Sequence, residues 1–405
     1  MAKLPKSVKQ YILVTGNYWA FTLTDGALRM LVVLYFYQLG YTPLSIAMLF
    51  LFYEIFGVIT NLVGGWLGAR LGLNRTMNIG LAIQIAALSM LLVPTELLTI
   101  AWVMLAQALS GIAKDLNKMS AKSAIKLLIP EEEPNNSESK SKLYHWVAIL
   151  TGSKNAMKGF GFFLGAFLLN TIGFYWAATS MAIALAFVLI ISLFKLEKQL
   201  GKVKAKPKIS HLFSKKSSIN YLSSARVFLF AARDIWFVVA LPVYLSSQLM
   251  WQHWQVGSFM AIWVIGYGLI QSQAPKITGH SPDGKGAMTW AFILSIVMAI
   301  ISFTFIILNE YVEIILIAGL VIFGVVFAVN SSLHSYLIVS YSDKDNISMD
   351  VGFYYMANAS GRLMGTLLSG WVYQAYGLAA CLWISFFMIL ISTLFTIGLP
   401  KLVIK

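Results

Sequence analysis

The sequence predicts an all-α polytopic membrane protein with twelve transmembrane helices, and two observations support this fold class. Hydrophobic residues make up 59% of the 405 residues and charged residues only 11%, whereas a soluble domain carries about 25% charged residues. Apolar stretches long enough to cross a bilayer, roughly 20 residues each, also recur along the whole chain. The apolar content and the single cysteine exclude a disordered chain and a disulfide-stapled scaffold.

Twelve stretches have the required length and composition. They cover residues 11–38, 44–68, 76–93, 97–121, 143–170, 174–195, 220–247, 254–275, 287–307, 313–340, 350–374 and 378–400. Lysines precede the first stretch, but no small-residue cleavage site follows a short apolar core, so we expect no cleavable signal peptide.

The basic residues support the number of spans and predict their orientation. The segment before the first span, every second loop after it and the segment after the last span together hold 22 of the 30 Lys and Arg residues, counting Lys195 at the end of the sixth span. The six alternate loops hold none. Because short Lys- and Arg-rich loops stay in the cytosol, we expect both termini to be cytosolic. The net charge of +14 therefore reflects topology and predicts no nucleic-acid partner.

The remaining eight basic residues lie inside the spans, where four acidic residues accompany them, not counting Glu313 and Asp350 at the first positions of their spans. A charge at the bilayer centre costs about 2.5–3.5 kcal/mol on insertion scales, so such residues are candidates for function. Five lie near mid-span, and three lie closer to the cytosolic end. The mid-span group is Arg29, Lys154, Lys158, Arg233 and Arg362, and the other group is Lys114, Lys118 and Arg226.

Structural ion pairing is one interpretation of these charges. The mid-span acids are Asp25, Glu54 and Asp234. Asp25 and Arg29 are four residues apart and could neutralise each other on one helix face. Three acids can pair with at most three of the five mid-span cations. Pairing is least able to explain Lys154 and Lys158, because like charges one helical turn apart repel each other, and more strongly at low dielectric.

The chain divides into two halves of six spans. A lysine-rich segment at 197–219 separates a predicted N-terminal bundle, 1–196, from a C-terminal bundle, 220–405. The halves resemble each other weakly, because residues correspond in the same order at nearly constant offsets. The pairs are Asp25 with Asp234, Tyr35 with Tyr244, Gly57 with Gly266, Lys158 with Arg362, Gly161 with Gly365, Ala166 with Gly370 and Gly173 with Gly377. Two parallel six-helix repeats are a known transporter plan.

Intramembrane cations on both halves indicate a small anionic ligand with more than one negative centre. Arg offers a planar fork that matches phosphate-like oxyanions, and Lys offers a strong point charge. We expect Arg29, Lys154 and Lys158 to hold one end of the ligand and Arg233 and Arg362 to hold the other. Lys114 and Lys118 would form a cytosolic funnel, and Asp25, Glu54 and Asp234 would balance charge or carry protons.

The loop after the second span resembles a family signature. Residues 65–75 read Gly-Trp-Leu-Gly-Ala-Arg-Leu-Gly-Leu-Asn-Arg, similar to the Gly-x-Leu-x-Asp-Arg-x-Gly-Arg-Arg loop of the major facilitator superfamily. The resemblance implies a gating motif that includes Gly65, Arg70, Gly72 and Arg75. Ala69 replaces the usual Asp, which removes one partner of the charge relay. With the span count and basic middle loop, the resemblance covers the whole chain and implies two six-helix bundles.

A narrower resemblance is carried by several runs on both halves. They are residues 22–30, 52–70, 108–120, 150–156, 206–208, 230–238 and 263–268. These runs look like the organoarsenical efflux permease of bacterial arsenic-resistance operons. The resemblance implies a bacterial inner-membrane exporter of 1-arseno-3-phosphoglycerate, coupled functionally to glyceraldehyde-3-phosphate dehydrogenase and conferring arsenate resistance. The lone Cys381 agrees with a hard oxyanion, because trivalent arsenic would select clustered thiolates.

Other functions remain open at this stage. An organic-phosphate/phosphate exchanger or a proton-coupled antiporter of the same superfamily would use the same basic residues. Uniport is a third coupling mode. We expect no enzyme, because the sequence contains no metal-ligand spacing, nucleophile motif or Gly-rich nucleotide loop. We also expect no cofactor or metal, and a monomer surrounded by lipid.

Overall fold

The computed structural model describes residues 6–71, 73–125, 137–196, 216–279, 282–342 and 347–400. Nearly all of these residues are helical, and none of them lies in a β-strand. The predicted all-α class is therefore confirmed.

The helices follow the predicted spans closely. The first half contains α1 (Lys6–Gln38), α2 (Pro43–Leu49), α3 (Leu51–Leu71), α4 (Leu73–Met90), the short 3-10 helix η1 (Thr95–Leu97), α5 (Ile100–Ile125) and α6 (Ser137–Lys195). The second half contains α7 (Ser217–Phe237), α8 (Ala240–Ser247), α9 (His253–Thr278), α10 (Gly284–Ile307), the short η3 (Asn309–Tyr311), α11 (Val312–Tyr341) and α12 (Ile347–Ile397).

Twelve membrane-crossing segments result from these helices within the described part of the chain. α2 and α3 form one segment that is interrupted only at Phe50, and α7 and α8 form another. α6 and α12 are each two segments, because a glycine with φ of 75° divides them at Gly173 and Gly377. A positive φ is easy for glycine alone. By length and apolar composition alone, seven helical stretches of the described residues could cross a membrane.

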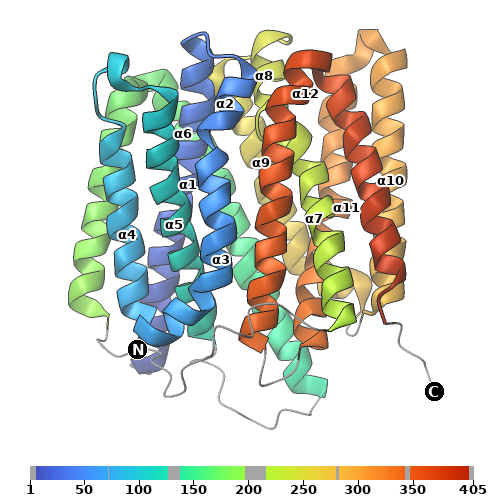
Figure 1. The fold of residues 1–405 in the computed structure, drawn as a ribbon, viewed down its shortest axis with the longest axis horizontal. Helices are drawn as coiled ribbons and strands as arrows, with labels where there is room; N and C mark the ends of the chain where they lie inside the picture. Colours follow the sequence, from blue (N-terminus) through green and yellow to red (C-terminus); the bar gives the residue numbers. More distant parts are fainter. Residues whose placement is uncertain are drawn as a thin grey trace, which may run out of the picture.

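The segments run roughly parallel to one another, with the first half and the second half side by side (Figure 1). α1 begins and α12 ends at the same end of the bundle, which we call the terminal end. Across the boundary, α6 lies against α9, and α12 lies against α2 and α3. The spaces lined by these boundary helices are where a site between the halves can form.

The weak internal repeat has a structural counterpart. Gly173 and Gly377, paired by the sequence offset, make the same turn in equivalent helices. A Cβ on Gly161 of α6 would lie 2.2 Å from the carbonyl oxygen of Leu23 in α1, and one on Gly365 of α12 would lie 2.7 Å from that of Ala231 in α7. Small residues thus allow the same close helix approach in both halves. The domain boundaries stay predictions, since residues 197–215 lie outside the described part.

Candidate functional site

A central cavity lies between the two halves. It has a volume of about 140 Å³ for water-sized molecules, and its walls come from α1, α3, α5 and α6 on one side and α7, α9, α11 and α12 on the other. Seven basic side chains line it: Lys114, Lys118, Lys154, Lys158, Arg226, Arg233 and Arg362. Among the described residues, only two carboxylates line it, Asp25 and Asp115. The cavity wall is therefore strongly cationic.

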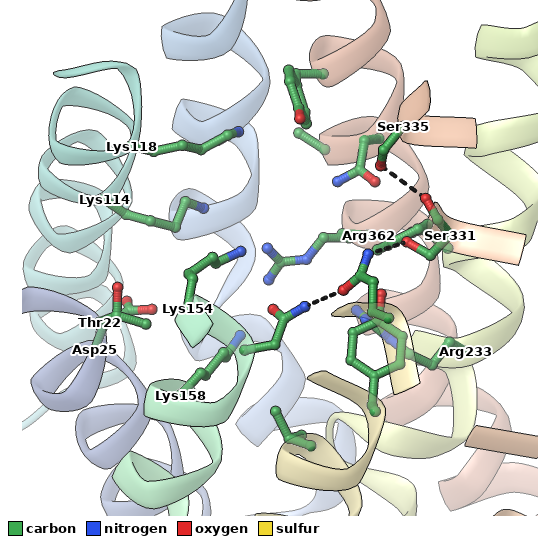
Figure 2. Close-up of a pocket in the computed structure, with 18 of the residues that line it drawn as sticks. Thr22, Asp25, Lys114, Lys118, Lys154, Lys158, Arg233, Ser331, Ser335 and Arg362 are labelled. Carbon is green, nitrogen blue, oxygen red and sulfur yellow. Dashed lines mark hydrogen bonds between the residues drawn. The ribbon is translucent and has the colours of Figure 1, made fainter. Parts of the chain in front are cut away.

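The lysines come from the first half and the arginines from the second. Figure 2 shows Lys114, Lys118 and Lys154 pointing from one side of the cavity toward Arg362 on the other. Lys154 and Lys158 are one turn apart on α6, as the sequence predicts, so both reach the same space. Helix periodicity alone thus places two like charges together, and helix packing adds the opposing arginines.

Glu54 forms ion pairs with arginines of both halves. This carboxylate is completely buried on α3 and receives two hydrogen bonds on one oxygen. One comes from Arg29 of α1 at 2.9 Å, and the other comes from Arg362 of α12 at 2.6 Å. Arg29 does not line the central cavity but a smaller neighbouring pocket. The possible pairing of Asp25 with Arg29 is not found, because Arg29 pairs with Glu54 instead.

Asp234 plays the corresponding part in the second half. Its carboxylate pairs with Arg233, its chain neighbour, and with Arg362, whose Nε lies 3.4 Å away. Together with Glu54, these contacts form a chain of alternating charges from Arg29 to Arg233. Three of the five mid-span cations are thus paired, as the sequence argument allowed, but by two carboxylates rather than three.

Asp25, the third mid-span acid, has a neutral partner. Its Oδ1 accepts a hydrogen bond of 2.8 Å from the Tyr53 hydroxyl. No carboxylate of the described residues lies within ion-pair distance of Lys158, whose nearest assigned contact is the Phe162 ring at 5.5 Å. Lys158 is therefore a half-buried cation that lines the cavity and is available to an anionic ligand.

Lys114 and Lys118 share a carboxylate from their own helix. Asp115 lies 3.8 Å from Lys114 Nζ and 3.4 Å from Lys118 Nζ. Lys118 also donates to the Asn61 side chain at 2.6 Å, and each ammonium lies over a tyrosine ring, Tyr53 or Tyr355. Asp115 thus holds two ammonium groups of its own helix at the edge of the cavity.

Arg226 lines the cavity although the sequence analysis did not select it as a binding residue. Its guanidinium donates to Asn358 at 2.8 Å and to the Ser331 carbonyl at 3.3 Å, and it stacks 3.9 Å from the Phe230 ring. It pairs with no carboxylate among the described residues. Arg226 lies toward the cytosolic end of its span, but it is on the face of α7 that lines the cavity.

Uncharged polar groups complete one wall, and the sequence analysis did not find them either. Asn155 of α6 donates to Gln271 of α9 at 2.7 Å, across the boundary between the halves, and Gln271 contacts Ser331 at 3.4 Å. Asn155 lies within the 150–156 run that carries the family resemblance, but no pattern assigned it a role, and Gln271 lies in no such run. Isolated amides within apolar spans are the only signal that could have found them.

The predicted gating motif is only partly described. Arg75 is exposed in the first turn of α4. Gly72 and the surroundings of Gly65 and Arg70 lie outside the described residues. The gating role of these four residues stays a prediction.

Solved structures share this fold. A bacterial homologue of the iron transporter ferroportin in an outward-facing state has a TM-score of 0.68 at 13% identity, covering 97% of this chain and 99% of that one. The human organic anion transporter MFSD10 (TETRAN) has 0.68 at 14%, covering 97% and 100%. A mutant form of the nucleoside transporter NupG has 0.68 at 16%, covering 97% and 98%. No curated protein was similar enough in sequence to count as a relative.

Two similar helical halves around a polar cavity define a membrane transporter. The family model of the Major Facilitator Superfamily matches residues 14–278, more than half of the chain. The chain belongs to the major facilitator superfamily, and it is a multi-pass transporter rather than an enzyme. This confirms the family that the loop signature indicated.

Proposed function

We propose that this protein transports a small organic anion that carries at least two negative charges, such as an organic phosphate. The observation that carries the proposal is the cavity wall, in which seven basic side chains face two carboxylates. Lys158 has no carboxylate partner among the described residues. A multivalent anion would supply the missing charge, since a cation within a membrane span is costly until it is paired.

The fold alone does not select this cargo. The similar structures belong to transporters named for iron, organic anions and nucleosides, and at such low identity they support the fold only. The charges favour an anion among these classes, because the lysines and arginines would repel a metal cation and a nucleoside would bring no negative charge to them. Among the described residues, no group of His, Cys, Asp and Glu could hold a metal ion.

Resemblance to the organoarsenical efflux permease narrows the proposal to 1-arseno-3-phosphoglycerate. This compound combines a carboxyl-linked arsenate with a phosphate, so it has two oxyanion ends separated by a short carbon chain. Lys154 and Lys158 would hold one end, and Arg233 and Arg362 the other. Lys114 and Lys118 would attract the anion from the terminal end. The single cysteine, Cys381, is buried away from the cavity, which agrees with recognition of a hard oxyanion.

We propose export across the bacterial inner membrane by alternating access, with both termini in the cytosol. An interior-negative potential favours exit of an anion by about 2.3 kcal/mol per charge per 100 mV. A substrate that moves two net charges therefore needs no coupled ion. Glu54 and Asp234, each held between arginines, serve in this scheme as fixed counter-charges.

Transport by everted membrane vesicles tests the proposal. Vesicles that contain the protein receive glyceraldehyde 3-phosphate, NAD, its dehydrogenase and radiolabelled arsenate, and the trapped label is counted. We expect accumulation only when all four components are present, and none in vesicles lacking the protein.

Two other outcomes separate the alternatives. Equal uptake of glyceraldehyde 3-phosphate without the dehydrogenase would indicate an organic-phosphate transporter and contradict the arsenical cargo. Accumulation that requires phosphate on the opposite side would indicate exchange, and accumulation that is abolished by collapsing the proton gradient alone would indicate proton antiport.

A further inference from the structure

A second pocket, which shares no lining residue with the central cavity, lies between the start of α1 and the end of α6. Its walls include Ile12, Leu13, Val188 and Ile191, and Lys9 and Lys195 also line it. The Gln10 amide donates to the Lys195 carbonyl at 3.1 Å, which holds the two helix ends together. Among the described residues, the pocket is thus an apolar groove with two lysines at one end and no carboxylate in its lining.

The position of the groove relative to the membrane is fixed by the two helices. The apolar span of α1 begins at Ile12, three residues after Lys9, and the apolar span of α6 ends at Lys195. Three residues of helix correspond to about 4.5 Å. Both lysines therefore lie at the level of the lipid headgroups, and the apolar part of the groove lies at the level of the acyl chains.

Side chains around the groove are exposed rather than covered by other described parts of the chain. Ile12 is 54% exposed, and Phe194, beside Lys195, is 86% exposed. At Gly16 in the groove, a Cβ would meet no atom within 4 Å, so the missing side chain leaves open space. Apolar surface of this kind at membrane depth is covered by acyl chains, and the paired lysines add a preference for negative headgroups.

We propose that this groove binds one anionic phospholipid, with an acyl chain along Gly16 and Val188 and the phosphate between Lys9 and Lys195. The lipid would bridge α1 and α6, the first and last helices of the first half. Of these two helices, α1 carries Asp25 of the central site, so the lipid would fix the position of α1 against the second segment of α6, which follows Gly173. The proposal is independent of the identity of the transported anion.

Native mass spectrometry of the purified full-length protein tests this site. The protein is incubated in detergent with equal amounts of phosphatidylglycerol and phosphatidylcholine, and bound lipid is counted. We expect retention of one phosphatidylglycerol in preference to phosphatidylcholine. The K9Q/K195Q variant should lose this preference, by about fivefold for each lysine, because each contributes about 1 kcal/mol of attraction to an anionic membrane.

Matched variants keep the test decisive. K276Q/K285Q removes two exposed lysines near the same end of the bundle, and it should bind lipid like the unchanged protein. G16L should displace the lipid by filling the groove while both lysines remain. Equal retention of the two lipids, or equal loss in K9Q/K195Q and K276Q/K285Q, would overturn the proposal. If K9Q/K195Q does not fold, G16L decides the test: a folded G16L variant that retains phosphatidylglycerol fully would also overturn the proposal.

Discussion

At the scale of single residues, the central site depends on which cations are already neutralised. Arg29, Arg233 and Arg362 have carboxylate partners, whereas Lys158 has none among the described residues. When an anionic substrate binds, a paired arginine must give up part of its interaction with the carboxylate. This loss offsets part of the arginine's contribution to the binding free energy. A lysine without a carboxylate gains the whole interaction.

We therefore predict that Lys158→Ala lowers transport of the anion by tenfold or more. A hydrogen bond to a charged group contributes about 1.5–3 kcal/mol, and about 1.4 kcal/mol corresponds to a factor of ten in an equilibrium constant. Initial rates in everted vesicles measure the effect at several substrate concentrations. Lys285→Ala, which changes an exposed lysine of α10, is the control. An unchanged rate in Lys158→Ala at equal protein content would refute the assignment.

Arg226 provides a second prediction at this scale. Because its guanidinium lines the cavity and has only neutral partners among the described residues, we expect Arg226→Gln to weaken substrate binding about tenfold, by the same charge-assisted contribution. The substrate concentration for half-maximal transport measures this. If Arg226 serves only to pack the helices, thermal stability should fall while that concentration stays constant.

At the scale of helices, glycines determine how closely α1 and α6 approach. A Cβ on Gly161 would lie 2.2 Å from the Leu23 carbonyl oxygen, and one on Gly165 would lie 2.1 Å from that of Ala27. Both distances are far shorter than any van der Waals contact, and the obstacle is backbone. The lysines of α6 are therefore held against α1 by packing that allows no side chain at these positions.

We predict that Gly161→Ala destabilises the protein by about 1–3 kcal/mol, the usual cost of overpacking. Gly266→Ala on α9 should be neutral or slightly stabilising, because its Cβ meets no atom within 4 Å and alanine favours helix. Thermal unfolding of the purified variants in detergent compares the two. Equal melting temperatures would show that α1 and α6 can separate without cost.

At the scale of the whole molecule, one carboxylate connects the two halves. Glu54 in the first half accepts hydrogen bonds from Arg29 of its own half and from Arg362 of the other half. Removing one partner of a buried ion pair leaves an uncompensated charge. The chain from Arg29 to Asp234 therefore both holds the halves together and sets the charge of the site between them.

We predict that Glu54→Gln lowers stability by about 3–5 kcal/mol, as measured for broken buried pairs. Glu96→Gln removes an exposed carboxylate from η1 and should change stability little. If the loss comes from unpaired arginines, adding Arg362→Gln should recover part of it. An additive loss in the double variant would contradict the ion-pair explanation.

The sequence alone determined the number of spans and the residues that carry charge inside them. Apolar length and loop charge report transfer of each segment between water and lipid, which depends on local composition. Helix period also placed Lys154 and Lys158 on one face. These predictions needed no contact between distant parts of the chain.

Only the tertiary structure decided which charges pair and which stay available. Glu54 and Arg362 are 308 residues apart in sequence, and Asn155 and Gln271 meet across the boundary between the halves. Such contacts depend on helix rotation and packing, which single-helix periodicity does not fix. The sequence therefore showed that excess positive charge lies within the membrane, and the packed helices determined that carboxylates neutralise the arginines at mid-membrane while Lys158 faces the cavity without one.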